Sequence, residues 1–176
     1  MSRLESGLAR LRLWDSALCV RFNGAVRIAP VRRVFRIISR LGDGVFWYSL
    51  MLSLLATGGA AALGPVGRMA GTGLLCTLIY KWLKSKTSRP RPFAVENAVR
   101  AGADPLDPFS FPSGHTLHAV AFSVVAVAFY PMLAWLLVPF TLLVATSRVV
   151  LGLHYPSDVL AGAAIGAALA GLSFGI

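Results

Sequence analysis

Five long apolar stretches alternate with polar segments after residue 43. They cover approximately residues 45–63, 66–83, 116–130, 132–146 and 156–176. A helix needs about 20 residues to cross about 30 Å of hydrocarbon, and the third and fourth stretches reach that length with their flanking residues. Gly64-Pro65 and Tyr130-Pro131 predict tight turns between neighbouring stretches. The pattern predicts an all-α membrane bundle of about five transmembrane helices, forming one domain over residues 44–176.

Residues 1–43 follow a different pattern, which is basic and amphipathic. Val31, Val34, Phe35 and Ile38 repeat at helical spacing. Nine arginines are interspersed, at positions 3, 10, 12, 21, 27, 32, 33, 36 and 40. Helices of this kind usually lie in the membrane interface. We therefore predict an interfacial segment over residues 1–43, divided near Pro30.

The composition is that of an integral membrane protein. Hydrophobic residues make up 56% of the chain and charged residues only 14%, whereas soluble domains carry about 25% charged residues. The net charge of +10 then favours anionic lipid rather than nucleic acid as a partner. Two cysteines exclude a disulfide framework. The Gly162-xxx-Gly166 spacing permits close helix contact, which we expect inside the bundle of a monomer or weak homodimer.

Three polar blocks interrupt the apolar pattern, and counting crossings places them on one membrane face. They run from Lys84 to Pro92, from Pro112 to His115, and from Ser147 to Asp158. The second and fourth stretches end at the first and third blocks, and the third stretch begins at the second block. By the same parity, residues 1–43 lie on that face. Ionisable residues at membrane depth are costly and indicate function.

The cations of these blocks are suited to phosphate. Arg91 and Arg148 present planar forks that match phosphate oxygens, and Lys84 adds a compact charge. Ser113 is predicted to cap the helix that follows, so that N–H groups near Gly114 point at an anion. Each feature also has an ordinary explanation, as a lipid anchor or a simple helix cap. We assign that explanation to Lys81, Lys86 and Arg89.

Two histidines complete the set. Asp158 follows His154 by four residues, so in a helix its carboxylate would accept from one imidazole nitrogen and leave the other free to attack. An alternative is a His–Asp pair that only closes a loop. His115 is predicted to lie in the first turn of the next helix of the bundle, after Ser113.

Together, Lys84…Arg91-Pro92, Pro112-Ser113-Gly114-His115 and Ser147-Arg148…His154…Asp158 resemble the signature of the type 2 phosphatidic acid phosphatase superfamily, which also includes vanadium haloperoxidases. The resemblance implies a helical phosphatase without metal or cofactor. His154 would be the nucleophile and form a phosphohistidine, Asp158 would orient it, and His115 would protonate the leaving group. Lys84, Arg91, Arg148, Ser113 and Gly114 would bind the phosphoryl oxygens. Members commonly have six spans, whereas this pattern predicts five.

Three alternatives remain open at this stage. His115, His118, His154 and Asp158 could hold a metal, although the nearby cations would repel it and His118 is expected to hydrogen-bond within its helix. Ser113 could act in a Ser–His hydrolase. A non-catalytic lipid-phosphate binding or transport protein is the alternative from another class.

The substrate expected for such a membrane site is a lipid phosphate or diphosphate. Phosphatidic acid, phosphatidylglycerol phosphate and undecaprenyl diphosphate fit equally well. The loop over residues 93–111 is expected to cover the pocket, although its acidic residues could also belong to a plain connector. Of 17 basic residues, only Arg68 lies on the face opposite the blocks, which predicts a cytoplasmic catalytic face in the cell (inner) membrane. The resemblance favours the periplasmic side as the alternative.

Overall fold

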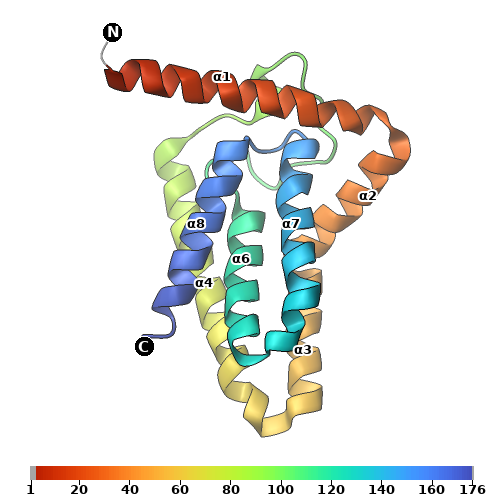
Figure 1. The fold of residues 1–176 in the computed structure, drawn as a ribbon, viewed down its shortest axis with the longest axis vertical. Coiled ribbons are helices and arrows are strands. Elements are labelled where there is room, and N and C mark those ends of the chain that lie inside the picture. Colours follow the sequence, from red (N-terminus) through yellow and green to blue (C-terminus); the bar gives the residue numbers. More distant parts are fainter. Residues whose placement is uncertain (1–2, 176) are drawn as a thin grey trace.

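The computed structural model describes residues 3–175 and shows a helical bundle (Figure 1). Residues 1, 2 and 176, which belong to the predicted N-terminal segment and last span, lie outside the described residues. The helices are α1 Arg3–Asn23, α2 Ala29–Arg40, α3 Phe46–Gly58, α4 Leu63–Thr87, α5 Pro92–Val95, α6 Gly114–Phe129, α7 Ala134–Val150 and α8 Pro156–Leu172. Short helical turns join several of them: η1 Gly24–Arg27, η2 Leu41–Val45, η3 Gly59–Ala62 and η4 Pro131–Leu133.

Each of the five apolar stretches contains one helix, namely α3, α4, α6, α7 and α8. By length and composition, two helical segments of the described chain are sufficient to cross a membrane. They are Ala29–Thr87, which runs continuously through α2, α3 and α4, and Pro131–Val150. The helices α6 and α8 are apolar but shorter. The all-helical class is confirmed, and the number of crossings stays a prediction.

The helix α6 forms the centre of the bundle, with α4, α7 and α8 packed around it (Figure 1). Two glycines bring α8 directly against its backbone. A Cβ added at Gly162 would lie 2.6 Å from the Ser113 carbonyl oxygen, and one at Gly166 would collide with the Leu117 carbonyl oxygen. The predicted close packing of this motif within the bundle is confirmed. It fixes the start of α6 beside the start of α8, where two of the motif blocks lie.

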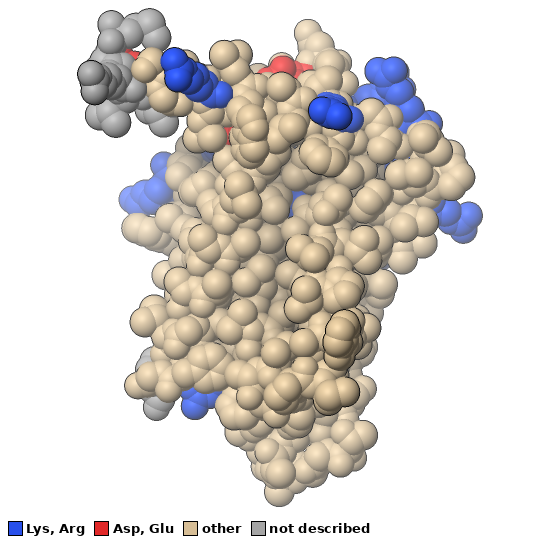
Figure 2. Space-filling view, in the orientation of Figure 1, with Lys and Arg blue, Asp and Glu red and all other residues tan. Residues whose placement is uncertain are grey.

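The visible face of the bundle carries few charged side chains over most of its length (Figure 2). Large side chains such as Leu52, Leu74 and Trp135 are exposed on α3, α4 and α7. Most of the visible Lys and Arg side chains gather near α1 and α2, at one end of this body. Such an apolar belt is unusual for a soluble monomer and is the surface expected against lipid.

The helix α1 lies across the end of the bundle, over the loops that carry the motif blocks (Figure 1). Asn23 donates to the backbone carbonyls of Arg100 and Val150 at 2.8 and 2.9 Å. Ser16 donates to Glu96 at 2.6 Å. These contacts place the N-terminal segment at the same end as the motif blocks, as the crossing parity predicts.

The helix α2 packs along the side of the bundle, and its predicted interfacial position stays a prediction. It descends beside α7 and buries Ser39 there. It then continues into α3 through the kinked turn η2, where Gly44 adopts φ +123°. An L residue rarely adopts that conformation, so glycine permits the kink. The predicted boundary at residue 43 therefore falls inside this continuous turn, and Asp43 is carried to the edge of a cavity.

Candidate active site

A cavity of about 460 Å³ lies between α3, α4 and α6, at the end of the bundle nearest α1. The lining of its polar part combines residues from all three motif blocks: Lys84, Arg91, Gly114, His115, Arg148 and His154. Lys84, Arg91, Arg148 and His154 are almost fully buried. The structure thus brings together three cations and two imidazoles that are up to 70 residues apart in sequence.

Asp107 organises two of the cations, a role that the sequence did not indicate. Its carboxylate accepts from Lys84 Nζ at 2.7 and 2.8 Å and from Arg91 Nη2 at 3.2 Å. Arg91 Nε also donates to the Asp107 carbonyl at 2.8 Å. Burial would raise the pKa of Asp107, but its contacts with Lys84 and Arg91 outweigh that effect and hold the pKa below its usual value. An ionised carboxylate therefore occupies the place beside Lys84 and Arg91 in this structure.

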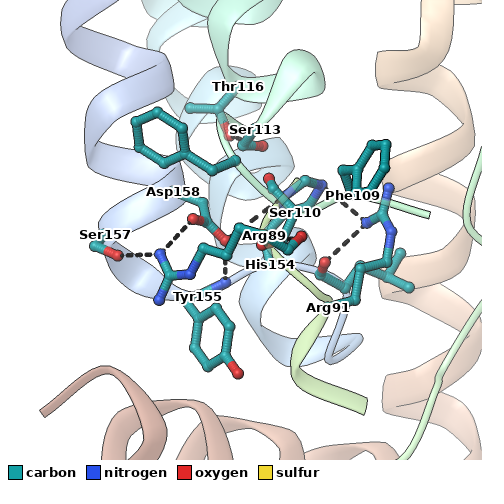
Figure 3. A network of polar contacts seen from close by, with 12 residues as sticks. Arg89, Arg91, Phe109, Ser110, Ser113, Thr116, His154, Tyr155, Ser157 and Asp158 are labelled. Atoms are coloured by element: carbon teal, nitrogen blue, oxygen red, sulfur yellow. Dashed lines mark hydrogen bonds and ion pairs between the residues drawn. The ribbon is translucent and has the colours of Figure 1, made fainter. Parts of the chain in front are cut away.

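His154 presents one nitrogen to the cavity and anchors the other (Figure 3). Its Nδ1 lies 2.6 Å from the Ser110 carbonyl oxygen, which can only accept, so Nδ1 carries the proton. Its Nε2, which carries no proton in this tautomer of the neutral ring, accepts from Arg91 Nη1 at 3.2 Å. Burial, reinforced by Arg148 and Arg91, holds the pKa of His154 well below its usual value. The ring is therefore an oriented, neutral imidazole.

The predicted hydrogen bond between Asp158 and His154 is replaced by a longer contact. Asp158 Oδ2 lies 3.9 Å from His154 Nδ1, which is too far for a hydrogen bond, and it accepts instead from the Tyr155 N–H at 2.9 Å. The reason is local: α8 begins at Pro156, so His154 precedes the helix and the i, i+4 spacing does not apply to it. The Ser110 carbonyl, which the sequence did not indicate, makes the orienting hydrogen bond.

Arg89 holds the other side of Asp158, which corrects its assignment as a lipid anchor (Figure 3). Its Nη1 donates to Asp158 Oδ1 at 2.6 Å, and its Nη2 donates to Asp15 on α1 at 2.9 Å. Asp15 is buried and also accepts from the Ser157 N–H at 2.9 Å. Burial alone would lower the pKa of Arg89, but Asp15 and Asp158 raise it above its usual value.

The remaining two ionisable groups contact residues before α3. His115 Nε2 lies 3.5 Å from Asp43 Oδ1 in the turn η2. Arg148 donates from Nη1 to the Ser39 hydroxyl on α2, while its buried Nε has no hydrogen-bond partner within the described chain. Sequence reasoning missed Ser39 and Asp43. The Gly42-Asp43-Gly44 triplet, which interrupts an otherwise helical pattern, is the signal that could have identified this turn.

Ser113 and His118 are both engaged by neighbouring groups of the bundle, and only His118 lines the cavity. Ser113 begins α6, but its buried hydroxyl pairs with Thr116 Oγ1 at 3.0 Å rather than with a backbone N–H, and it does not line the cavity. This placement removes the basis for a Ser113 hydrolase. His118 contacts the Gly114 carbonyl at 2.9 Å and Thr77 Oγ1 at 3.1 Å, as expected for a histidine satisfied within the bundle. It therefore does not join His115 in a ligand set.

The cavity continues from its polar end into an apolar part between α3 and α4. The apolar lining consists of Trp47, Met51, Ala70, Leu74 and Phe122. Gly73 keeps this part accessible, because a Cβ there would approach the Phe122 ring to 2.7 Å. The site as a whole can therefore accept a molecule with an anionic group at one end and a hydrocarbon portion at the other.

Comparisons with known proteins agree with this chemistry. Undecaprenyl-diphosphatase BcrC of Bacillus subtilis is 38% identical over 103 residues, which are 57% of this chain and 47% of the relative. Lipid A 1-phosphatase of Rhizobium johnstonii is 28% identical over 161 residues, which are 79% of this chain and 65% of the relative. The chain thus spans about half to about two thirds of these curated relatives.

Two solved structures share the fold over nearly the whole chain. LpxE of Aquifex aeolicus matches with a TM-score of 0.81 and 26% identity, over 93% of this chain and 96% of that one. A transmembrane PAP2-type phosphatidylglycerolphosphate phosphatase of Bacillus subtilis matches with a TM-score of 0.70 and 26% identity, over 94% and 85% of the two chains. The N-terminal helices are included in matches of this extent.

The family assignment rests on the region that carries the site. The model of the PAP2 superfamily matches residues 65–176, which is well over half of the chain. That range contains all three motif blocks and every cation and histidine of the polar cavity, together with Asp107 and Ser110. The chain is a member of the PAP2 superfamily.

Proposed function

We propose that this chain is a membrane phosphatase that hydrolyses a lipid phosphate or diphosphate. The observation that carries the proposal is the composition of one cavity. Lys84, Arg91 and Arg148 line its polar end with two histidines, and its other part is apolar. Relatives named for undecaprenyl diphosphate, lipid A and phosphatidylglycerol phosphate support a lipid substrate. Phosphatidic acid has the same chemistry and belongs to the same substrate class.

In the first step, His154 Nε2 attacks the phosphorus atom. The substrate phosphoryl displaces the Arg91 contact on Nε2 and binds between Arg91, Lys84 and Arg148, which stabilise the charge of the transition state. A P–N bond forms while the P–O bond to the lipid breaks. Protonated His115 donates its proton to the departing oxygen, and Asp43, whose Oδ1 lies 3.5 Å from His115 Nε2, holds the ring in place.

In the second step, water attacks the phosphohistidine. His115, now neutral, accepts a proton from the water as the new P–O bond forms. The P–N bond breaks, inorganic phosphate is released and neutral His154 is regenerated. The Ser110 carbonyl keeps the proton on Nδ1 through both steps. The positive charge needed for phosphoryl transfer comes from the side chains of the protein, so the proposed reaction is independent of metal.

Phosphate release from purified protein in lipid nanodiscs tests the proposal. The panel consists of phosphatidic acid, phosphatidylglycerol phosphate, undecaprenyl diphosphate and lipid A 1-phosphate, each with and without EDTA. We expect turnover of at least one lipid, insensitive to EDTA, and a loss of about 10²- to 10⁴-fold in His115→Ala. Absence of turnover with every lipid, or turnover in His154→Ala close to that of the wild type, contradicts the proposal.

We further propose that the catalytic end faces the cytoplasm, on the strength of charge distribution. The arginines of α1 and α2 lie at the catalytic end, while Arg68 lies near the opposite end on α4. Short basic segments are retained in the cytoplasm. Ala101→Cys and Gly64→Cys, in a background without Cys19 and Cys76, place one exposed thiol at each end. An impermeant thiol reagent should label Gly64→Cys and spare Ala101→Cys in intact spheroplasts, and the reverse pattern contradicts the orientation.

A further inference from the structure

A second cavity of about 510 Å³ adjoins the catalytic one. It lies between α2 and the loop over residues 101–106. Asp43, Leu106, His115 and Arg148 line both cavities. The catalytic residues His115 and Arg148 therefore form the boundary between a cavity with a large apolar part and one that is mostly polar.

Three arginines line this second cavity. Arg36 and Arg40 lie one turn apart on the same face of α2, opposite Arg148 of α7. Arg36 is held in place, because its Nε and Nη2 donate to the Gly102 carbonyl at 3.1 and 2.7 Å. Arg40 is exposed. Asp43 and Asp104 also line the cavity, so three arginines face two carboxylates and a surplus of positive charge remains.

The guanidinium at the boundary has an unused donor. Arg148 is buried, its Nη1 donates to the Ser39 hydroxyl, and its Nε lacks a hydrogen-bond partner within residues 3–175. A buried donor without a partner is costly, and a bound ion or water is one of the explanations for such a group in a native protein. A tetrahedral oxyanion in the second cavity would accept hydrogen bonds from this side chain and from the guanidinium groups of Arg36 and Arg40 on α2.

We propose that the second cavity binds a phosphate group on the polar side of His115. This inference rests on the proposed function for the source of the phosphate. One source is the inorganic phosphate released when the phosphohistidine is hydrolysed, since the groove between α3 and α4 is lined by hydrocarbon and does not suit an anion. The other source is the second phosphoryl group of a lipid diphosphate. The chemistry recognised is the same in both cases.

Binding of radiolabelled inorganic phosphate to protein in nanodiscs tests the site without requiring turnover. The variant Arg40→Gln removes one guanidinium group from the cavity lining. The control is Arg33→Gln, which lies about two turns away on the same helix, outside the lining, and makes the same change in net charge. We expect two saturable classes in the wild type. One of them should weaken about tenfold in Arg40→Gln and stay unchanged in Arg33→Gln. A single class, or equal effects of both variants, overturns the inference.

Kinetics with farnesyl phosphate and farnesyl diphosphate, which differ by one phosphoryl group, identify the source. If the site holds released phosphate, Arg40→Gln raises the inhibition constant of inorganic phosphate about tenfold with both substrates. If it holds the second phosphoryl group, Arg40→Gln raises KM for farnesyl diphosphate alone. An unchanged inhibition constant together with unchanged KM values contradicts a role in the reaction. If phosphate binds in two classes and no lipid of the panel above turns over, the second site is supported and the proposed function fails.

Discussion

Arg89 on the loop after α4 donates to the Asp158 carboxylate at 2.6 Å, and its second nitrogen donates to Asp15 of α1 at 2.9 Å. The N-terminal helix is thereby connected to the segment that carries the proposed nucleophile. Asp158 in turn binds the Tyr155 N–H and lies 3.9 Å from His154 Nδ1. Because every member is largely buried except Arg89, removal of one partner leaves an unbalanced charge.

We therefore expect Asp15→Asn to lower kcat about tenfold with little change in KM. The groups proposed to contact the phosphate stay in place, while the segment that carries His154 becomes less rigid. The measurement is steady-state phosphate release. Glu96→Gln is the matched control, because Glu96 also tethers α1, through Ser16 at 2.6 Å, without contacting Arg89. A rise in KM at constant kcat, or the same loss in Glu96→Gln, would show that α1 acts only as a general support.

Asp107 pairs with Lys84 and Arg91, the two cations that the proposed mechanism assigns to phosphate, and it would compete with an incoming phosphate for them. Its neutral replacement, Asp107→Asn, should free both cations and tighten inhibition by vanadate about tenfold, as expected when one charged hydrogen-bond partner is removed. The inhibition constant is measured beside that of Asp104→Asn, a neighbouring exposed carboxylate. Weaker inhibition in Asp107→Asn would mean that this carboxylate holds the cations in their binding positions.

The contact between α8 and α6 should tolerate no added carbon at Gly166. Gly166→Ala is expected to cost about 1–3 kcal/mol, because the new methyl group meets the Leu117 backbone, which cannot rotate away. Thermal unfolding in detergent measures the change. Gly171→Ala on the same helix has open space around the new Cβ and should leave the unfolding temperature unchanged or raise it slightly. Equal behaviour of the two variants would contradict this packing.

The ionisation of His154 gives a pH prediction. Its pKa is well below 6.5 in the folded protein, and 6.5 is its usual value in an unfolded chain. Between these two values only the unfolded chain binds the proton. The contribution of His154 to stability is therefore present above pH 6.5 and is lost as the pH falls toward the folded pKa. Spectra of ¹⁵N-labelled histidine, assigned with His154→Gln, should show a neutral ring at pH 6, and a protonated ring there contradicts the prediction.

Features of the fold that follow from local sequence patterns were predictable, whereas those that depend on tertiary contacts were not. Apolar stretch lengths and crossing parity were enough to predict the five helices of the bundle and to place Lys84, His115 and Arg148 at one end. The charge pattern could not distinguish Arg89 from a lipid anchor, because a basic residue after a helix looks the same in both roles. Its partners, Asp15 and Asp158, lie 74 and 69 residues away in sequence.

The finer geometry depended on where helices begin. A capping pattern correctly predicted the start of α6, but the Ser113 side chain pairs with Thr116 instead of facing the cavity. The spacing of His154 and Asp158 suggested a direct hydrogen bond, which fails because Pro156 starts the helix between them. The Ser110 carbonyl and Asp43 belong to irregular segments, and no periodicity in the sequence indicates where such segments fold.

The central claim is that His154 becomes phosphorylated during turnover, and rapid acid or base quenching tests it most directly. The protein is mixed with a substrate carrying a ³²P-labelled terminal phosphate, and the quenched protein is digested and mapped. The account predicts a label that is stable in base, labile in acid and located on the peptide containing His154, and that is absent from His154→Ala. A label on another residue, or a label that persists in His154→Ala, would contradict it.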